Sequence, residues 1–188
     1  MIFLTGGTGF LGSQLLGRLL LAYPSEDIGV LVRSNGERSA RERTLLVLKE
    51  LFPRDIASQL SKRVISVEGD LTKPRLGLAN GDISMLSSQV SKVFHCAASV
   101  SFSQAIQEAR IANVSSTDRV LDLTYLVQRT RGDVVPFHYV STAYVVGDTE
   151  RTVGPDELCL DGQFKNTYEQ SKAEAEFAVR QACNSLHC

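Results

Sequence analysis

A tyrosine and a lysine lie four positions apart near the end of this 188-residue chain, in the segment Tyr168-Glu-Gln-Ser-Lys172. On a helix this spacing places the phenol and the ammonium group on one face. A free phenol titrates at about pH 10, but a neighbouring cation stabilises the phenolate and lets the phenol exchange protons closer to neutral pH. The pair is therefore suited to reducing a carbonyl group, with Tyr168 as the proton donor, although surface helices often carry the same pair.

Two hydroxyl side chains, Ser141 and Thr142, follow an apolar run upstream of this pair. Thr142 can hydrogen-bond the substrate oxygen as hydride reaches the carbonyl carbon, and Ser141 is the alternative donor. Lys172 can also hold the ribose of a nicotinamide cofactor. We predict a catalytic set of Thr142, Tyr168 and Lys172, in which Tyr168 and Lys172 also contact the cofactor.

Glycines are dense at the start of the chain, in Thr5-Gly-Gly-Thr-Gly-Phe-Leu-Gly12. This segment contains the pattern G-x-G-x-x-G between an apolar run and a stretch of helical periodicity. In that setting the glycines allow a tight turn, and backbone N–H groups at the helix N-terminus meet the pyrophosphate of a dinucleotide. The alternative is a glycine-rich turn that binds nothing. The predicted cofactor contacts are Gly6, Gly7, Thr8, Gly9, Phe10, Leu11 and Gly12.

The choice between the two nicotinamide cofactors depends on Arg33, which ends the apolar run Val-Leu-Val. NAD-binding chains usually carry Asp or Glu at this strand end, about 20 residues beyond the glycines. A guanidinium is permanently charged and forms a fork that matches phosphate oxygens, so it suits the 2′-phosphate of NADP(H). With no carboxylate at that strand end, the sequence favours NADP(H) over NAD(H); the alternative is a solvated surface arginine.

Two further segments are expected to contact the cofactor where strands end. Asp70 and Leu71 follow the next apolar run, and the Asp70 carboxylate can accept a hydrogen bond from an adenine amino group. Ala97 and Ala98 follow the run after that, and their small side chains leave room for a ligand. Both features also occur without any ligand, since Asp often caps helices and Ala is a common core residue.

The hydrophobic pattern predicts elements that place these residues together. Apolar runs and helical periodicity alternate along the chain, which favours parallel strands joined by right-handed crossovers and covered by helices on both faces. We therefore predict an α/β fold with a doubly wound parallel sheet of the Rossmann type, as one domain over residues 1–188. Strands are expected at 1–5, 27–33, 63–70, 92–98 and 134–146, and helices at 13–23, 41–52, 82–92, 103–128 and from 167 onward, with a loop at 147–164.

Composition narrows the possible partners. The formal net charge is −1, so no positive field exists to attract nucleic acid. No apolar run approaches the roughly 20 residues of a membrane span, and we expect a cytoplasmic protein. The four cysteines include no C-x-x-C pair, and the histidines share no ligand spacing, so no metal is predicted and the cysteines are expected to be reduced thiols.

The motifs together, in this order, resemble the extended short-chain dehydrogenase/reductases. They are TGGTGFLG, EGDL, HCAAS, Asn113 in IANVSST, YVSTAYVVG and YEQSK. The resemblance implies that Thr142, Tyr168 and Lys172 carry catalysis. It also implies that Asn113 lies at a helix bend and supports the lysine through a water molecule.

Within that family, GDLTKPRLGL, HCAASVSF and HYVSTAYVVG look most like the male-sterility-type branch, which reduces acyl thioesters with NADPH. The implied substrate is a small-molecule or carrier-bound acyl group. A nucleotide-sugar epimerase or dehydratase and a non-catalytic NADP-binding module are the alternatives. Members of this family continue into a sixth strand and a substrate-binding region, so we expect a Rossmann fold that is incomplete at its C-terminus and lacks that region. The oligomeric state is left open.

Overall fold

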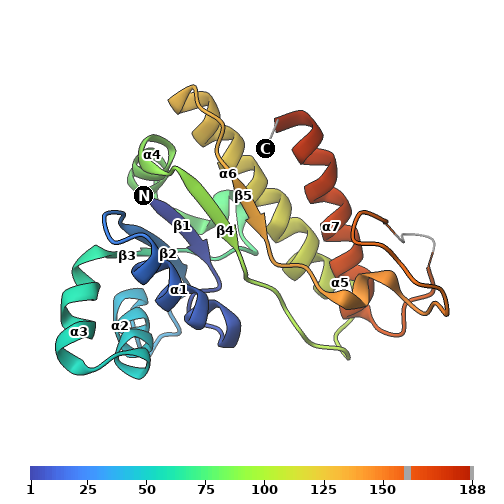
Figure 1. Cartoon of the computed structure of the whole chain (residues 1–188), viewed down its shortest axis with the longest axis horizontal. Helices are drawn as coiled ribbons and strands as arrows, with labels where there is room; N and C mark the ends of the chain where they lie inside the picture. The colour runs from blue at the N-terminus through green and yellow to red at the C-terminus, as the bar shows by residue number, and fades with distance from the viewer. Residues whose placement is uncertain (159–161, 187–188) are drawn as a thin grey trace.

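The computed structural model describes residues 1–158 and 162–186, and its centre is a five-stranded sheet with every neighbouring pair parallel. The strand order is β3-β2-β1-β4-β5, so the chain builds outward on both sides of β1 (Figure 1). This order confirms the doubly wound sheet that the sequence predicts. The strands are β1 (Ile2–Thr5), β2 (Ile28–Val32), β3 (Val64–Glu68), β4 (Lys92–His95) and β5 (Phe137–Tyr139).

Alternate residues of β1 define the two faces of the sheet. Ile2 and Leu4 pack into a core cluster with α1 (Phe10–Ala22), α2 (Ala40–Leu51) and α3 (Arg54–Leu60). Phe3 points the other way, into a second cluster with α4 (Asn80–Gln89) and α6 (Ser116–Arg131). All three β1 side chains are fully buried. Burial of each such side chain stabilises the fold by roughly 1.5–3 kcal/mol. The side chains of this one short strand therefore contribute to the packing of both helical layers.

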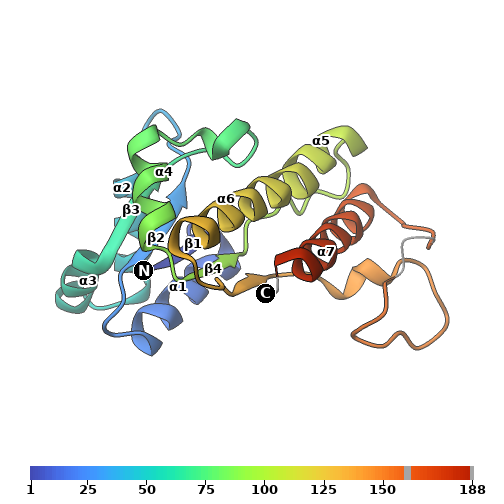
Figure 2. The same cartoon turned by 90° about the horizontal axis from the view of Figure 1, so that it is seen from above.

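The last helix, α7 (Thr167–Leu186), lies beside α6 in both ribbon views (Figures 1 and 2). Its start is fixed by a reciprocal cap: Asn166 accepts a hydrogen bond from the Glu169 N–H, and its side-chain amide donates to the Glu169 carboxylate. An Asn before the helix with Glu three residues later is a strong N-terminal signal. The cap places Tyr168 in the first turn of the helix and Lys172 in the second.

Two predicted elements differ from their sequence patterns, one in length and one in continuity. The fifth strand pairs only over Phe137–Tyr139, rather than over 134–146, because its neighbour β4 is itself only four residues long. Beyond it, Thr142 caps a 3-10 helix at Ala143–Val146. The helix predicted at 103–128 is divided into α5 (Ile106–Arg110), a π-helical turn at Ile111–Ser115, and α6.

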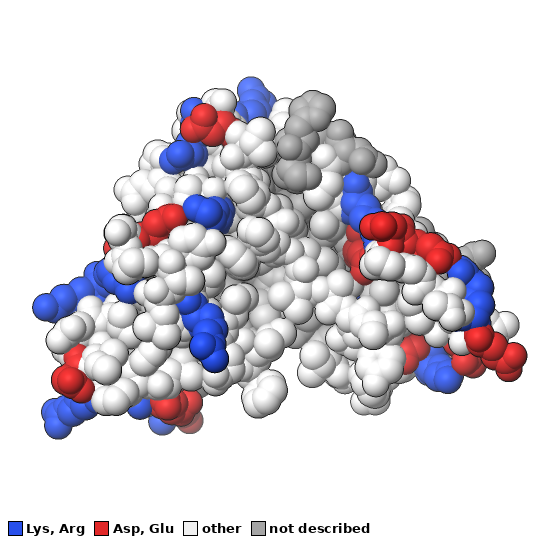
Figure 3. Space-filling model, in the orientation of Figure 1, with Lys and Arg blue, Asp and Glu red and all other residues white. Residues whose placement is uncertain are grey.

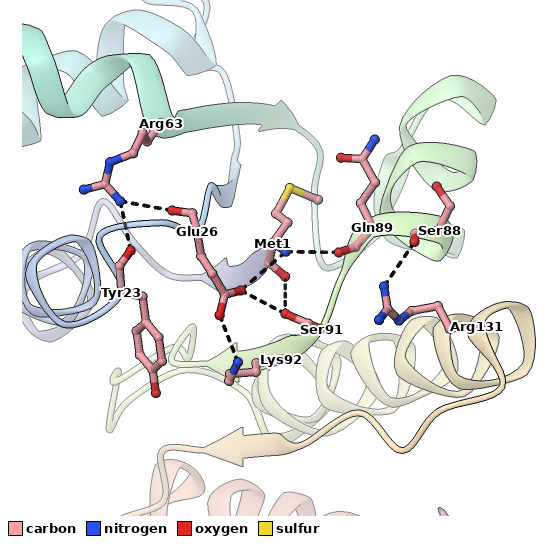
Figure 4. A network of polar contacts seen from close by, with 9 residues as sticks. All are labelled: Met1, Tyr23, Glu26, Arg63, Ser88, Gln89, Ser91, Lys92 and Arg131. Carbon is pink, nitrogen blue, oxygen red and sulfur yellow. Dashed lines mark hydrogen bonds and ion pairs between the residues drawn. The ribbon is translucent and has the colours of Figure 1, made fainter.

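The amino ends of the strands are closed by a polar network (Figure 4). Glu26 accepts hydrogen bonds from Lys92 and Ser91, each at 3.0 Å, and lies 3.4 Å from the Met1 amine. Arg63 donates to three backbone carbonyls at the end of α1 and in the turn that follows it.

Among the described residues, no helix is both long and apolar enough to cross a membrane.

Candidate active site

A cleft of about 780 Å³ lies at the carboxyl ends of the strands, opposite to the polar network at their amino ends. In the space-filling view the lower edge of the molecule is notched between its two halves, and most visible charges lie on the flanks (Figure 3). Two predicted site residues, Gly7 and Asn113, are not in the lining. The others all line this one cleft: Gly6, Thr8, Gly9, Phe10, Leu11, Gly12, Arg33, Asp70, Leu71, Ala97, Ala98, Thr142, Tyr168 and Lys172.

The glycine turn explains its own composition. Gly6 has φ +76°, and a Cβ there would lie 2.7 Å from the Ala97 nitrogen. A Cβ on Gly12 would lie 2.0 Å from the Gly6 carbonyl oxygen, so any side chain would push α1 away from the turn. Gly9 is the N-cap of α1 and offers no side-chain cap, and no acid lies in the first turn of the helix. The helix therefore presents N–H groups and a positive dipole end to the cleft, which suits a pyrophosphate.

Gly7 lies beneath the turn rather than on its surface. It is buried, and a Cβ there would lie 2.6 Å from a Val30 methyl group and 3.1 Å from a Leu4 methyl group. Its side-chain position is thus filled by the sheet below. The structure shows why a side chain is not tolerated at Gly7, and the cofactor contact that the sequence pattern predicts there stays a prediction.

Two arginines line the cleft close to the end of β2, and the sequence pattern predicted only one of them. Arg33 is exposed and lines the cleft, as does Arg43 on α2. Arg43 donates to the Arg33 carbonyl, and its other terminal nitrogen lies 3.4 Å from the Thr8 hydroxyl. The missed signal was a second arginine ten residues after the first, on the helix that follows the strand.

An acidic group also approaches this end of the cleft. Glu68 ends β3, opposite Val32 in the register, and accepts a 2.6 Å hydrogen bond from Ser34. The sequence offered no carboxylate at the end of the second strand, but the neighbouring strand supplies one. Since register is a tertiary property, this acid was not visible from the pattern around Arg33.

Asp70 is held by the turn that follows β3. The Thr72 N–H and hydroxyl both donate to one carboxylate oxygen, at 2.9 and 2.7 Å. Partial burial raises the pKa of Asp70, but these bonds and the nearby charges of Arg33 and Lys73 outweigh burial and leave the pKa below its ordinary value. The ionised carboxylate is thus ready to accept a hydrogen bond, as an adenine contact requires.

Lys172 is the most constrained residue of the catalytic set. Its side chain is buried, and Nζ donates to the Tyr139 hydroxyl at 2.6 Å and to the Val140 carbonyl at 2.8 Å. Burial lowers the pKa of Lys172 to about 8, against smaller opposing effects of Cys96 and Glu176. Tyr168 lies half-buried against Phe102, with ring centroids 5.5 Å apart, and among the described residues it makes no hydrogen bond to Lys172.

The two candidate hydroxyls behave differently. Ser141 donates to the Glu176 carboxylate, which is also ion-paired with Arg180 at 2.8 Å. Thr142 instead accepts a hydrogen bond from the Tyr144 N–H at 3.3 Å. The Thr142 proton is therefore available to a substrate oxygen, while the Ser141 proton is directed to a carboxylate.

Asn113 is buried in the π-helical turn, at the helix irregularity that the resemblance implies. Its amide accepts from the Ser99 N–H at 2.7 Å and donates to the Ser99 carbonyl and to the Ser171 hydroxyl. The side chain thus ties the loop after β4 to the residue next to Lys172. It does not line the cleft, and its predicted support of the lysine through water stays a prediction.

His95, the last residue of β4, is part of a buried polar chain. Its Nδ1 lies 2.6 Å from the Thr5 hydroxyl and its Nε2 3.0 Å from the Thr117 hydroxyl. Thr117 donates to the Asn113 carbonyl, so it accepts from His95 Nε2, and Nδ1 accepts from Thr5. Burial lowers the pKa of His95 to about 3, so the ring is neutral at physiological pH.

Side chains that commonly ligate metals are not clustered in the described part of the chain. Across residues 1–158 and 162–186, no group of three His, Cys, Asp or Glu side chains is placed to hold an ion. Neither Cys96 nor Cys183 is in a disulfide. Cys159, His187 and Cys188, which the sequence reasoning also considered, lie outside the described residues.

The fold and the cleft together define an NAD(P)-binding domain of the extended short-chain dehydrogenase/reductase class. Residues 4–188 match the family described as male sterility protein. The chain belongs to this family. The branch indicated by the sequence motifs is thus confirmed.

Individual relatives support the same assignment. Fatty acyl-CoA reductase 1 of Xenopus laevis is 32% identical over 99% of this chain, which spans 41% of that protein. The crystal structure of the terminal R domain from the myxalamid PKS-NRPS pathway superposes with a TM-score of 0.82 and 34% identity, covering 97% of this chain and 46% of that one. The chain therefore spans less than half the length of either relative.

A UDP-glucuronic acid 4-epimerase from Bacillus cereus, solved with NAD, is more distant. It shares 22% identity and a TM-score of 0.67, over 99% of this chain and 51% of that one. This likeness shows the fold alone.

Proposed function

We propose that this chain is the NADPH-binding part of an oxidoreductase that reduces an acyl thioester, carried by coenzyme A or by a carrier protein. The observation that carries the proposal is the convergence of Thr142, Tyr168 and Lys172 on the cleft that the glycine turn also lines. Membership of the male sterility protein family, and relatives that include a fatty acyl-CoA reductase, support the substrate class.

The residues present fit a dinucleotide. The cleft has room for one, and the glycine turn leaves open the space that any Cβ at Gly6 or Gly12 would fill. Gly9 to Gly12 and the uncapped start of α1 would hold the pyrophosphate, and Asp70 would accept from the adenine. Arg33 and Arg43 would hold a 2′-phosphate, which supports NADPH; Glu68, held by Ser34 beside them, opposes that preference by its charge.

The cofactor supplies the hydride. Thr142 donates a hydrogen bond to the carbonyl oxygen and stabilises the negative charge that grows there as the carbon–oxygen double bond becomes single. Tyr168 gives its proton to that oxygen. The Lys172 ammonium favours the phenolate left behind and holds the ribose. Loss of the thiol then gives an aldehyde, and a second round of the same reduction would give an alcohol.

Two alternatives differ in what they would turn over. A nucleotide-sugar epimerase or dehydratase uses the same phenol and ammonium, and the epimerase match supports that reading only through the fold. A binding module would hold NADPH and turn over nothing. The intact catalytic set favours an enzyme. A cytoplasmic location stays a prediction from the sequence.

The test is Tyr168→Phe in the full-length protein, assayed by NADPH oxidation with acyl-CoA and carrier-bound thioesters. Removing only the hydroxyl leaves the ring against Phe102 but removes the proton donor, so turnover should fall by about 10²- to 10⁴-fold with NADPH affinity nearly unchanged. Tyr144→Phe is the matched control, because Tyr144 is exposed and lies outside the cleft lining.

Equal turnover by wild type and Tyr168→Phe would defeat the mechanism. Turnover of a nucleotide sugar, with none of any thioester, would favour the epimerase or dehydratase. NADPH binding without turnover of either substrate class would favour the module.

A further inference from the structure

The Lys172 ammonium lies against a residue that the predicted catalytic set does not include. Its Nζ is 2.6 Å from the Tyr139 hydroxyl and 4.1 Å from the centroid of the same ring. We propose that Tyr139 is a positioning residue, which fixes the Lys172 side chain at the cleft and keeps it in the cationic form. This role rests on the proposed function, in which Lys172 holds the cofactor ribose and stabilises the Tyr168 phenolate.

The geometry shows what the ammonium needs. Lys172 is 1% exposed, so water does not solvate its charge, and burial lowers its pKa to about 8. A buried charge is tolerated only where hydrogen bonds replace its hydration. Tyr139 and the Val140 carbonyl use two of the three N–H groups. The third is left for the cleft, which Lys172 lines.

Tyr139 is suited to accept rather than to donate toward the lysine. Burial raises the pKa of Tyr139 well above its ordinary value, so the phenol stays neutral and offers Lys172 its oxygen lone pairs. The ring adds a cation–π contact, which strengthens when the cation is desolvated. Both contacts stabilise the same protonated form of Lys172.

The other titratable groups around Lys172 do not replace this acceptor. Glu176, one turn later on α7, acts on the charge of Lys172 but is bonded to Ser141 and Arg180. His95 on β4 is neutral, and burial raises the pKa of the Cys96 thiol after that strand. Tyr168 lies on the same helix, in the turn before Lys172.

The sheet itself holds Tyr139 in place. Thr5, His95 and Tyr139 lie side by side in the register at the ends of β1, β4 and β5. The His95 and Tyr139 rings are 5.8 Å apart, and His95 is fixed by Thr5 and Thr117. The position of the phenol is therefore set by strand pairing rather than by a surface loop, as a positioning role requires.

The experiment is Tyr139→Phe, which keeps the ring and deletes the acceptor. The pKa of Lys172 is measured by NMR of the chain labelled with ¹³C at lysine Cε, with the signal assigned by Lys172→Arg. Losing a hydrogen bond to a charged group should lower this pKa by roughly one to two pH units. Tyr125→Phe, which removes an exposed hydroxyl on α6, should leave it unchanged. An unchanged Lys172 titration in Tyr139→Phe would overturn the proposal.

A second readout separates positioning from general damage. In the full-length protein, the alkaline fall of kcat/KM should move to lower pH in Tyr139→Phe, while turnover near pH 5, where Lys172 stays protonated in both proteins, remains close to wild type. A loss of equal size at every pH would indicate a merely structural role and overturn the proposal. The titration needs no substrate, so a shifted pKa in a protein that turns over no thioester would defeat the proposed function and leave this role standing.

Discussion

The amino and carboxyl ends of the strands carry similar polar side chains, but these side chains make different use of their hydrogen-bonding groups. At the amino ends of the strands, Glu26 is bonded to Lys92 and Ser91 and lies beside the Met1 amine (Figure 4). These groups satisfy one another. At the carboxyl ends, the Arg33 guanidinium is exposed, the Thr142 proton is available, and Lys172 has one N–H left for the cleft.

The difference separates groups that stabilise the fold from groups that bind. A polar group whose hydrogen bonds are all made within the protein gains little from a ligand, whereas one with unused capacity does. The backbone follows the same division, because the glycine turn at the carboxyl ends keeps amide groups and space open. Substitutions at the carboxyl ends should therefore alter binding and turnover, and those at the amino ends should alter stability.

The largest effect expected from this comparison concerns the two hydroxyls after β5. Thr142→Ala should lower kcat by about 10²- to 10³-fold, since it removes a donor to the developing oxyanion. Ser141→Ala should cost less than about tenfold, because that proton already goes to Glu176. Both are measured by NADPH oxidation with a thioester substrate.

Thr142→Ser is the matched control, since it keeps the hydroxyl and the cap of the 3-10 helix and should retain most turnover. A larger loss from Ser141→Ala than from Thr142→Ala would reverse the assignment of the oxyanion donor.

The sequence predicted the parts of this site that depend on local pattern. Glycine spacing, strand ends and the Tyr-x-x-x-Lys helix are local features. Nearly every residue that they predict for the site lies in the cleft lining. What it missed depends on register and on helix position. Tyr139 meets Lys172 only through the placement of α7 against β5, and Glu68 reaches Ser34 only through the pairing of β2 with β3.

The misjudged boundaries have a similar cause. The apolar run at 134–146 fits a long strand by composition, but the ladder can extend only as far as its partner β4 does. The π-helical turn around Asn113 leaves no mark in a helical periodicity, because one extra residue in a turn barely changes which side chains are apolar. Gly7 adds a constraint that the motif alone does not reveal, because its side-chain position lies against Val30 and Leu4 of the sheet.

An intermediate effect is expected at the arginine pair. Arg33→Ala should weaken NADPH binding by about ten- to hundredfold and leave NADH binding nearly unchanged, because a charge-assisted phosphate contact contributes about 1.5–3 kcal/mol. Arg43→Ala should do the same and also loosen the turn, since Arg43 joins Arg33 to Thr8. Titration of both cofactors by fluorescence measures this.

Arg41→Ala is the matched control for this pair, because it removes an exposed charge from the same helix without touching the cleft lining. An unchanged ratio of NADPH to NADH affinity in Arg33→Ala would remove Arg33 from the 2′-phosphate site.

The smallest effect is expected at the amino ends of the strands, where a substitution should change stability and not cofactor binding. Glu26→Gln removes the charge that faces Lys92 and should lower the free energy of unfolding by about 1 kcal/mol, since the pair is partly exposed. The midpoint temperature of thermal unfolding should fall by roughly 2–4 °C, with NADPH affinity unchanged. The exposed Glu50→Gln is the control.

The contribution of Glu26 to stability should depend on pH, and the direction of its pKa shift gives the direction of that dependence. Partial burial raises the pKa of Glu26, but hydrogen bonds from Lys92 and Ser91 and the charges of Lys92 and the N-terminus outweigh it and hold the pKa below its ordinary value. A carboxyl whose pKa is lower in the folded chain stabilises the fold above the unfolded pKa and loses that contribution as the pH falls through the folded one. The stability gap between wild type and Glu26→Gln should therefore be full at pH 7 and shrink in acid below about pH 4.5. A gap that persisted undiminished in acid would mean that packing around residue 26, rather than its charge, closes this edge of the sheet.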